Sequence, residues 1–176
     1  TLANDAGPTT AVGNLGVTVA NVASNVAGTL AANGNASISA ATLDNTSGTI
    51  AAVKGNLTVA TVDSTTNTGG KMQAGARVDV PSTGLDNTSG KLLGDSIALN
   101  TRAQNLVNAG GTIAAAGAVA IHSGALDNDA GLVQSGGALS VDTHGASLRN
   151  TASAAHASGQ GGLVGGGTLD LSAGDV

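Results

Sequence analysis

The sequence predicts an all-β fold, a parallel β-helix (solenoid) of about eight coils of 20–22 residues with three short strands per coil. Three observations support this prediction: a repeat of about 21 residues, short alternating apolar runs, and a composition that disfavours helices. A fixed period of this length is typical of solenoids, in which each turn is one supersecondary unit. We therefore expect residues 1–176 to form a single β-helical repeat segment, an interior fragment of a longer array.

Asparagine marks the repeat most clearly, returning at intervals of 20 to 22 residues. If the first residue of each copy is position 0, asparagine occupies position +2 in all eight copies, and glycine occupies +5 in the first seven. The asparagines are Asn4, Asn25, Asn45, Asn67, Asn87, Asn108, Asn128 and Asn150. We predict that they form an internal ladder, because a buried amide must bond its neighbours or the turn backbone. The glycine suits a turn that needs positive φ or close backbone approach.

The three strands of each coil follow from apolar positions. Position 0 is mostly leucine, and position +7 is apolar from the second copy to the seventh. The residues at +7 are Leu30, Ile50, Met72, Leu92, Ile113 and Val133. After a glycine-containing break, apolar and polar residues alternate, as in residues 57–59, 78–80 and 97–99. Alternation with period two is the pattern of a half-buried strand.

The eighth copy departs from the pattern after Asn150. The expected glycine and apolar residues are delayed until residues 162–164, so about nine residues within 152–161 are inserted. Insertions in solenoids form loops on one face and often provide binding surfaces. We expect a surface loop that carries His156, with a disordered bulge without function as the alternative.

Composition favours an ordered chain without helices. Hydrophobic residues reach 41% although Phe, Tyr, Trp and Cys are absent, and all eleven acids are aspartate. Disordered chains combine low hydrophobicity with high net charge, and helices favour glutamate over aspartate. A net charge of −5 argues against a nucleic-acid partner, because phosphate binding needs a basic excess. No uncharged apolar run reaches the roughly 18 residues that would predict membrane insertion.

Four cations fall at similar positions on three consecutive coils. Lys71 and Lys91 occupy +6 of the fourth and fifth copies, whereas Lys54 and Arg77 occupy +11 and +12 of the third and fourth. Stacking would align them in a stripe that binds sulfated glycans or other anions through charge-assisted hydrogen bonds. The alternative is that they protect sheet edges and keep the chain soluble.

No catalytic arrangement is recognisable. Hydrolysis or elimination on a β-helix requires clustered carboxylates with a base or metal, but the aspartates are spread singly, with Asp127 and Asp129 the closest pair. His122, His144 and His156 occupy non-equivalent repeat positions, which argues against a metal site, and we expect them to be solvated or carried by loops. We predict a protein that is not an enzyme and uses no cofactor or metal.

The cassette Leu-Asp-Asn-x-x-Gly-x-Ile, followed by Gly-x-Leu-x-Val, resembles the repeats of filamentous haemagglutinin-type exoproteins over essentially the whole chain. The resemblance implies a right-handed β-helix in a very long bacterial protein, exported by two-partner secretion through an outer-membrane transporter. It implies an adhesin on the cell surface or released from it, which attaches to host-cell glycans or receptors. The alternative is a purely structural stalk or spacer, as in contact-dependent growth inhibition toxins.

Overall fold

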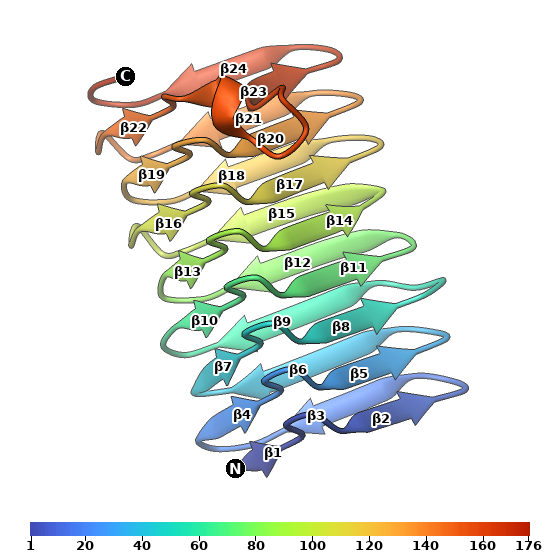
Figure 1. Cartoon of the computed structure of the whole chain (residues 1–176). Helices are drawn as coiled ribbons and strands as arrows, with labels where there is room; N and C mark the ends of the chain where they lie inside the picture. The colour runs from blue at the N-terminus through green and yellow to red at the C-terminus, as the bar shows by residue number, and fades with distance from the viewer.

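The chain folds as a parallel β-helix, which confirms the predicted fold; the structure, a computed structural model, describes all of residues 1–176. Eight coils of three strands stack from the N-terminus to the C-terminus (Figure 1). Each strand pairs in parallel with its equivalents in the adjacent coils, which gives three eight-stranded sheets. In Figure 1 the chain runs left to right along β2 in front and returns along β3 behind while it rises, so the helix is right-handed.

The three sheets are named A, B and C in the order in which each coil visits them. Sheet A has the shortest strands: β1 (Leu2–Ala3), β4 (Val22–Ser24), β7 (Thr42–Asp44), β10 (Thr65–Thr66), β13 (Leu85–Asp86), β16 (Leu106–Val107), β19 (Leu126–Asp127) and β22 (Leu148–Arg149). Sheet B contains β2 (Pro8–Ala11), β5 (Thr29–Ala32), β8 (Thr49–Ala52), β11 (Lys71–Ala74), β14 (Lys91–Gly94), β17 (Thr112–Ala115), β20 (Leu132–Ser135) and β23 (Gly162–Gly165). Sheet C contains β3 (Leu15–Thr18), β6 (Ala36–Ala40), β9 (Leu57–Thr61), β12 (Arg77–Pro81), β15 (Ser96–Asn100), β18 (Val119–His122), β21 (Leu139–Asp142) and β24 (Leu169–Ser172).

The strand register places equivalent repeat positions directly above one another. Leu43 at position 0 pairs with Ala23 in the coil before and with Thr65 in the coil after. The register resumes after the inserted residues, because Val133 in β20 pairs with Leu163 in β23. A slip of one residue would turn every inward side chain outward, so the core fixes this register.

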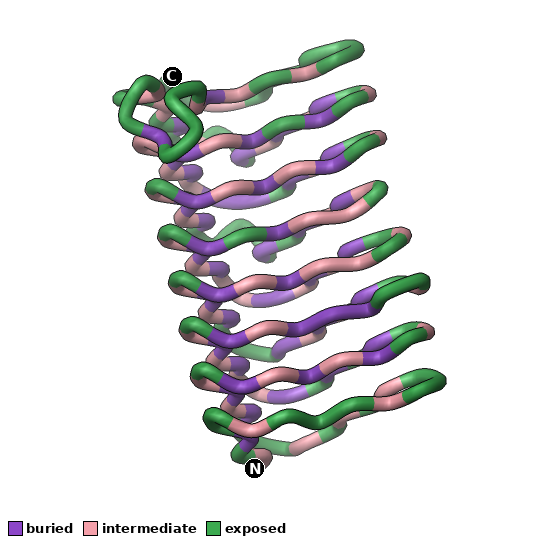
Figure 2. Tube along the Cα trace, turned by 45° about the vertical axis from the view of Figure 1, so that its right-hand side comes forward, coloured by how far each residue is buried: buried purple, intermediate pink, exposed green.

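Columns of aliphatic side chains fill the interior. One cluster of 28 buried hydrophobic residues runs through the rod, and no aromatic ring contributes to it. Ile50, Met72 and Leu92 form part of the column behind sheet B, since alternate strand residues face inward. The buried segments recur at the same places in successive coils (Figure 2). Full burial of each such side chain contributes about 1.5–3 kcal/mol.

Eight asparagine side chains form a continuous column at the corner between sheets A and B. The Nδ2 of each of the first seven donates to the Oδ1 of the asparagine in the next coil, at 2.6–2.8 Å. The same amide also donates to the carbonyl of its own +5 glycine, as Asn87 does to Gly90. In the first coil the Oδ1 of Asn4 accepts from the Thr9 hydroxyl, which explains why +7 is polar there. No buried side-chain nitrogen or oxygen lacks a partner.

From the second coil to the seventh, close backbone approach, rather than positive φ, requires the glycine at +5. A Cβ on Gly90 would lie 2.2 Å from the Asn67 carbonyl oxygen and 2.5 Å from the Asn87 Oδ1. Positive φ occurs one residue earlier, where six non-glycine residues have φ between 52° and 56°. These residues are Ala6, Ala27, Ser47, Ser89, Ala130 and Ala152. Of the two explanations that the sequence offered for glycine at +5, only close approach holds.

The other two corners carry polar columns that the sequence analysis missed. At the corner between sheets B and C, the Oδ1 atoms of Asn14, Asn35 and Asn56 each accept a backbone N–H from the following coil, at 2.8–3.1 Å. At the corner between sheets C and A, buried hydroxyls donate to carbonyls of the turn. They belong to Thr61, Ser82, Thr101, Ser123 and Thr143. Serine and threonine make the same bond, so residue identity does not reveal this column.

Replacement of Asn87 by alanine should break the ladder at its centre. The change removes the acceptor of Asn67, the donor to Asn108 and the donor to Gly90. We expect the free energy of unfolding to fall by about 3 kcal/mol, because buried polar groups lose their partners. Urea denaturation followed by circular dichroism measures this loss. The exposed Asn105→Ala should change stability by less than about 0.5 kcal/mol, and equal losses in both variants would contradict a bonded ladder.

Replacement of Gly90 by alanine should cost about 3 kcal/mol, because the new methyl group meets a backbone carbonyl that cannot move aside. Gly16→Ala is the matched control, since a Cβ there has no atom within 4 Å. That variant should be neutral or more stable by up to about 1 kcal/mol. Thermal unfolding of both proteins provides the comparison, and a tolerated Gly90→Ala would show that the close approach is not required.

Candidate functional site

An ordered loop covers part of the outer face of sheet B near the C-terminus. Twelve residues, 150–161, join β22 to β23, whereas four residues, 128–131, join β19 to β20. Within the loop, Ser153–Ala155 forms a single 3₁₀ turn. The loop lies in front of β20 and β23 (Figure 1), so the insertion adds a ridge to one face of the rod.

His156 anchors this loop to the sheet. Its Nε2 lies 3.1 Å from the Thr112 hydroxyl in β17, and its Nδ1 lies 2.8 Å from the Ser158 hydroxyl. Thr112 belongs to the sixth coil, so the loop of the eighth coil reaches across the strand between them. His156 is carried by the loop, as the sequence predicts, but it is only 7% exposed, and both of its ring nitrogens have partners within the chain.

A shallow groove of about 430 Å³ separates the loop from the neighbouring strands. Its lining combines aliphatic side chains with an ammonium group, an imidazole and two hydroxyls. The lining residues are Lys91, Leu93, Thr112, Leu132, His156, Ala157 and Ser158. Apolar walls with a few polar groups are typical of ligand sites, and the position on a sheet face suits an extended ligand.

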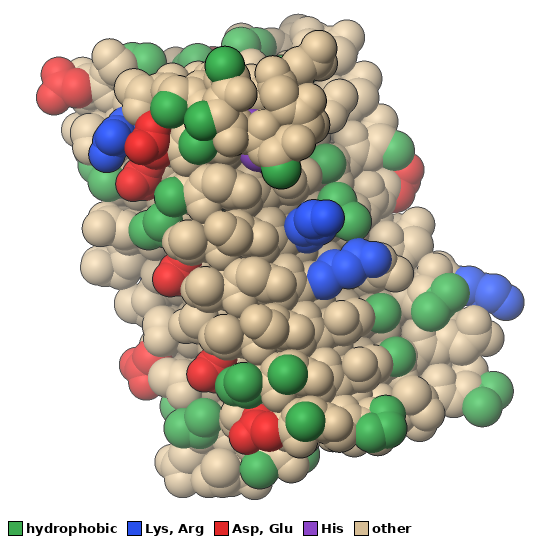
Figure 3. Space-filling model, viewed as in Figure 1, with side chains coloured by type: hydrophobic (Ala, Val, Ile, Leu, Met, Phe, Trp, Pro, Cys, Tyr) green, Lys and Arg blue, Asp and Glu red, His purple; other side chains and the backbone are tan.

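Lys91 lines this groove, and Lys71 lies beside it in the adjacent strand. They are directly paired in β11 and β14, with Thr49 before them and Thr112 after them in the same outward column. Two adjacent basic side chains are visible over sheet B below the loop (Figure 3). None of the salt bridges involves a lysine. Like charges directly opposite each other destabilise a sheet, so the stability of the fold does not explain this pair of lysines.

Lys54 and Arg77 do not extend this pair into the predicted stripe of four cations. Lys54 follows the end of β8, whereas Lys71 pairs with Thr49 at the beginning of β8, roughly 15 Å away at the rise of a strand. Arg77 begins β12 in sheet C and forms a salt bridge of 3.4 Å with Asp79. The four cations are divided because positions +6 and +11 of the repeat lie at opposite ends of a strand of sheet B.

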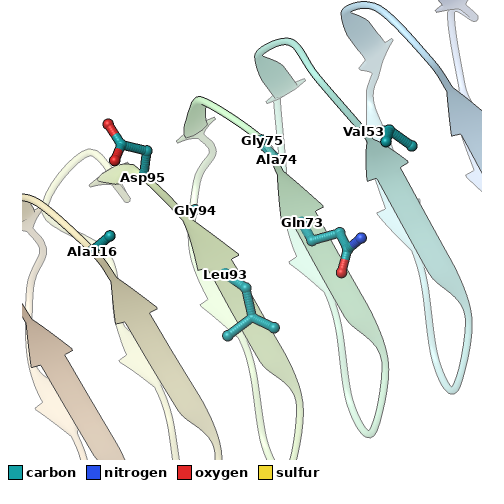
Figure 4. A pocket seen from close by; sticks show the side chains of 8 residues that line it. All are labelled: Val53, Gln73, Ala74, Gly75, Leu93, Gly94, Asp95 and Ala116. Carbon is teal, nitrogen blue, oxygen red and sulfur yellow. The ribbon is translucent and has the colours of Figure 1, made fainter.

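A second depression, of about 370 Å³, lies where the strands of sheet B end (Figure 4). It is lined by Val53, Gln73, Ala74, Gly75, Leu93, Gly94, Asp95 and Ala116. Leu93 lines both this depression and the groove beside the loop, so the two hollows adjoin on one face. Asp95 is the only ionisable side chain in the depression, and one carboxylate does not make an acid–base pair.

The acids that the sequence analysis considered for catalysis serve turns and an ion pair. Asp127 accepts the backbone N–H of Asp129, and Asp44 and Asp86 make the same turn with the residue two positions later. Asp129 forms a salt bridge of 3.0 Å with Arg149. Each of these acids therefore has a partner in a turn or in an ion pair.

His122 and His144 lie around Asp142, although their repeat positions differ. His122 pairs with Asp142 between β18 and β21, and His144 follows in the next turn. The Oδ2 of Asp142 is 3.8 Å from His122 Nδ1 and 3.9 Å from His144 Nε2. The backbone N–H of His144, with the charges of both imidazoles, lowers the pKa of Asp142 below its ordinary value despite some opposing desolvation. The turn conformation creates this cluster, and repeat numbering does not show it.

Comparison with known proteins gives one family. The family model described as Haemagglutinin repeat matches residues 10–67, 52–110 and 98–176, so its matches include both the lysine pair and the loop. No curated protein and no solved structure matches the chain. None of the helical segments is long and apolar enough to cross a membrane.

Loss of the His156 anchor should release the loop while the coils remain intact. In His156→Ala or Thr112→Ala we expect hydrogen exchange to accelerate in residues 150–161 and little elsewhere, because the bond between loop and sheet is gone. Hydrogen–deuterium exchange with mass spectrometry resolves this segment. Thr29→Ala is the matched control, since Thr29 occupies the same column in the second coil, far from the loop. Unchanged exchange in both anchor variants would show that the loop is held by other contacts.

Proposed function

Because the chain belongs to the haemagglutinin repeat family, we propose that it is a segment of a filamentous bacterial adhesin that attaches to anionic host-cell glycans through sheet B. Repeats of this family typically come from secreted or surface-exposed adhesins, which supports a location at the bacterial surface or outside the cell. The observation that carries the glycan assignment is the Lys71–Lys91 pair, without acidic partners, beside the groove under the loop.

The chemistry of this face suits sulfated or carboxylated sugars. The two ammonium groups, of which Lys91 lines the groove, provide charge-assisted hydrogen bonds to an anionic substituent. Leu93 and Leu132 offer apolar surface to the C–H face of a sugar ring. The chain has no aromatic ring on which a sugar could stack, so binding depends on charge and weakens as salt increases.

The scaffold supports binding to a long polymer. The asparagine column and the aliphatic core hold the outward columns of sheet B in a fixed register, so the lysines need little ordering when a ligand arrives. A glycan chain that spans several coils makes several weak contacts at once, and multivalency then raises the overall affinity.

The absence of cysteine fits export through an outer-membrane transporter, which is the secretion route that we propose for this protein. Without disulfides, no covalent cross-link opposes passage of an unfolded chain. Folding afterwards depends on contacts between successive coils, which can form in order as the chain emerges.

A purely structural stalk is the second candidate function. The unbroken ladder and the mostly neutral outer surface favour it, because a spacer needs stiffness and solubility but no ligand. In that case the segment would hold a receptor-binding or toxin region away from the cell. The two functions differ in whether the 176-residue chain by itself binds host cells or a glycan array.

Heparin chromatography with matched double variants tests the adhesive function. We expect Lys71→Ala/Lys91→Ala to elute at clearly lower salt than the parent chain and to bind heparin roughly tenfold more weakly, because two exposed charged contacts are lost. Lys54→Ala/Arg77→Ala removes the same net charge from a different part of the rod and should elute close to the parent.

The two variants together separate a local site from a general charge effect. Equal weakening in both would show that heparin senses only net charge. Unchanged elution of Lys71→Ala/Lys91→Ala, with no binding of the parent to sulfated members of a glycan array, would favour the stalk.

A further inference from the structure

We propose that His122, Asp142 and His144 bind a divalent transition-metal ion on the outer surface of sheet C. The three side chains come from adjacent coils: His122 lies at the end of β18 and Asp142 at the end of β21, where they are direct partners. His144 lies two residues beyond Asp142, and its ring centroid is 6.3 Å from that of His122. This site is independent of the proposed adhesive face on sheet B.

The potential ligand atoms converge on the same carboxylate oxygen. His122 Nδ1 and His144 Nε2 lie 3.8 and 3.9 Å from Asp142 Oδ2. In a tetrahedral zinc site, ligand atoms about 2.1 Å from the ion lie about 3.4 Å apart. In their present positions, no three or more His, Cys, Asp or Glu side chains of the chain are placed so that they could hold a metal ion, and these three are no exception. Binding therefore requires side-chain rotations that shorten the two nitrogen–oxygen distances by about 0.4–0.5 Å and bring the two imidazole nitrogens toward each other, and the half-exposed positions of these side chains leave room for them.

Two hydrogen bonds orient the ligands toward the ion. The backbone N–H of His144 donates to Asp142 Oδ1 at 2.9 Å, which leaves Oδ2 free. His144 Nδ1 lies 3.0 Å from the Ser123 carbonyl oxygen, which can only accept, so Nδ1 carries the proton and Nε2 has a free lone pair. Metal-binding histidines commonly donate their second N–H to a backbone carbonyl in this way, and the bond fixes the tautomer.

The turn that presents His144 also occurs at this corner in another coil. The residue types in the turn, rather than its conformation, therefore distinguish the His144 copy. Arg102 has the same left-handed conformation and donates to Asn100 in the same manner. The column around the cluster is otherwise neutral, with Asn100 next to His122 on one side and Ser172 next to Asp142 on the other. No competing cation therefore occupies the carboxylate.

Two imidazoles and one carboxylate select the class of ion. This donor set suits Zn²⁺, Ni²⁺, Co²⁺ or Cu²⁺, whereas Ca²⁺ and Mg²⁺ prefer oxygen ligands throughout. The side chains are 52%, 36% and 50% exposed, so the remaining coordination positions stay open to water. An ion at this point would join the sixth and seventh coils across β18 and β21 and should raise the melting temperature.

Isothermal titration calorimetry of the full chain, without a histidine tag, tests the site with zinc chloride. We expect one ion per chain and no response to calcium chloride. His122→Gln, Asp142→Asn and His144→Gln should each weaken zinc binding roughly tenfold or more. His156→Gln removes the third histidine, and Asp170→Asn removes one charge from the same sheet; both should bind zinc like the parent.

Two further measurements separate binding from folding. Zinc should raise the melting temperature of the parent chain but not that of His144→Gln. In nuclear magnetic resonance spectra of the unmodified chain, the ring signals of His122 and His144 should shift with zinc while those of His156 stay in place, a readout that needs no variant. Zinc binding that persists in the three ligand variants, or ring shifts confined to His156, would overturn the assignment.

Discussion

A buried amide needs partners for its oxygen and both of its N–H groups, and this requirement organises the whole rod. Asn87 is fully buried, donates to Asn108 and to Gly90, and accepts from Asn67. These bonds exist only if successive coils are in register and the turn brings the +5 carbonyl close. The asparagine bonds thus require this period, this register and this glycine position, and burial of the aliphatic columns requires the same register.

The ladder also has a direction, because each of the seven bonds between asparagines is donated toward the C-terminal coil. Each coil therefore relies on the one before it for a donor, and Asn4 obtains that donor from Thr9 instead. An aliphatic residue at +7, as in the second to seventh coils, has no hydroxyl that could donate this hydrogen bond. The polar Thr9, which breaks the apolar pattern of the sequence, is explained by the bond that it makes.

The sequence predicted the features that depend on residue identity at a fixed period, and missed those that depend on contacts between coils. The strand at position 0 and the asparagine ladder were predicted because leucine recurs at position 0 in most copies and asparagine recurs at +2 in all of them. The column of hydroxyls at the corner between sheets C and A was not predicted, because Ser82 and Thr101 donate the same kind of hydrogen bond from different residue types. The bond from His156 to Thr112 joins residues 44 apart, and nothing in the local pattern of the loop indicates it. The four cations do not form one stripe, because residues at similar positions in the repeat can lie at opposite ends of a strand or on different sheets of the coil.

Both candidate binding constellations follow one rule of solenoid geometry. Inward positions are fixed by the ladder and the core, but outward positions contribute little to stability and are free to carry chemistry. Two functional side chains come together when they occupy the same outward position in successive coils, as Lys71 and Lys91 do in sheet B and His122 and Asp142 do in sheet C. Each pair is separated by 20 residues, the same as the step from Asn67 to Asn87. In this rod the residue spacing that builds the core therefore also indicates which outward side chains lie next to each other on the surface.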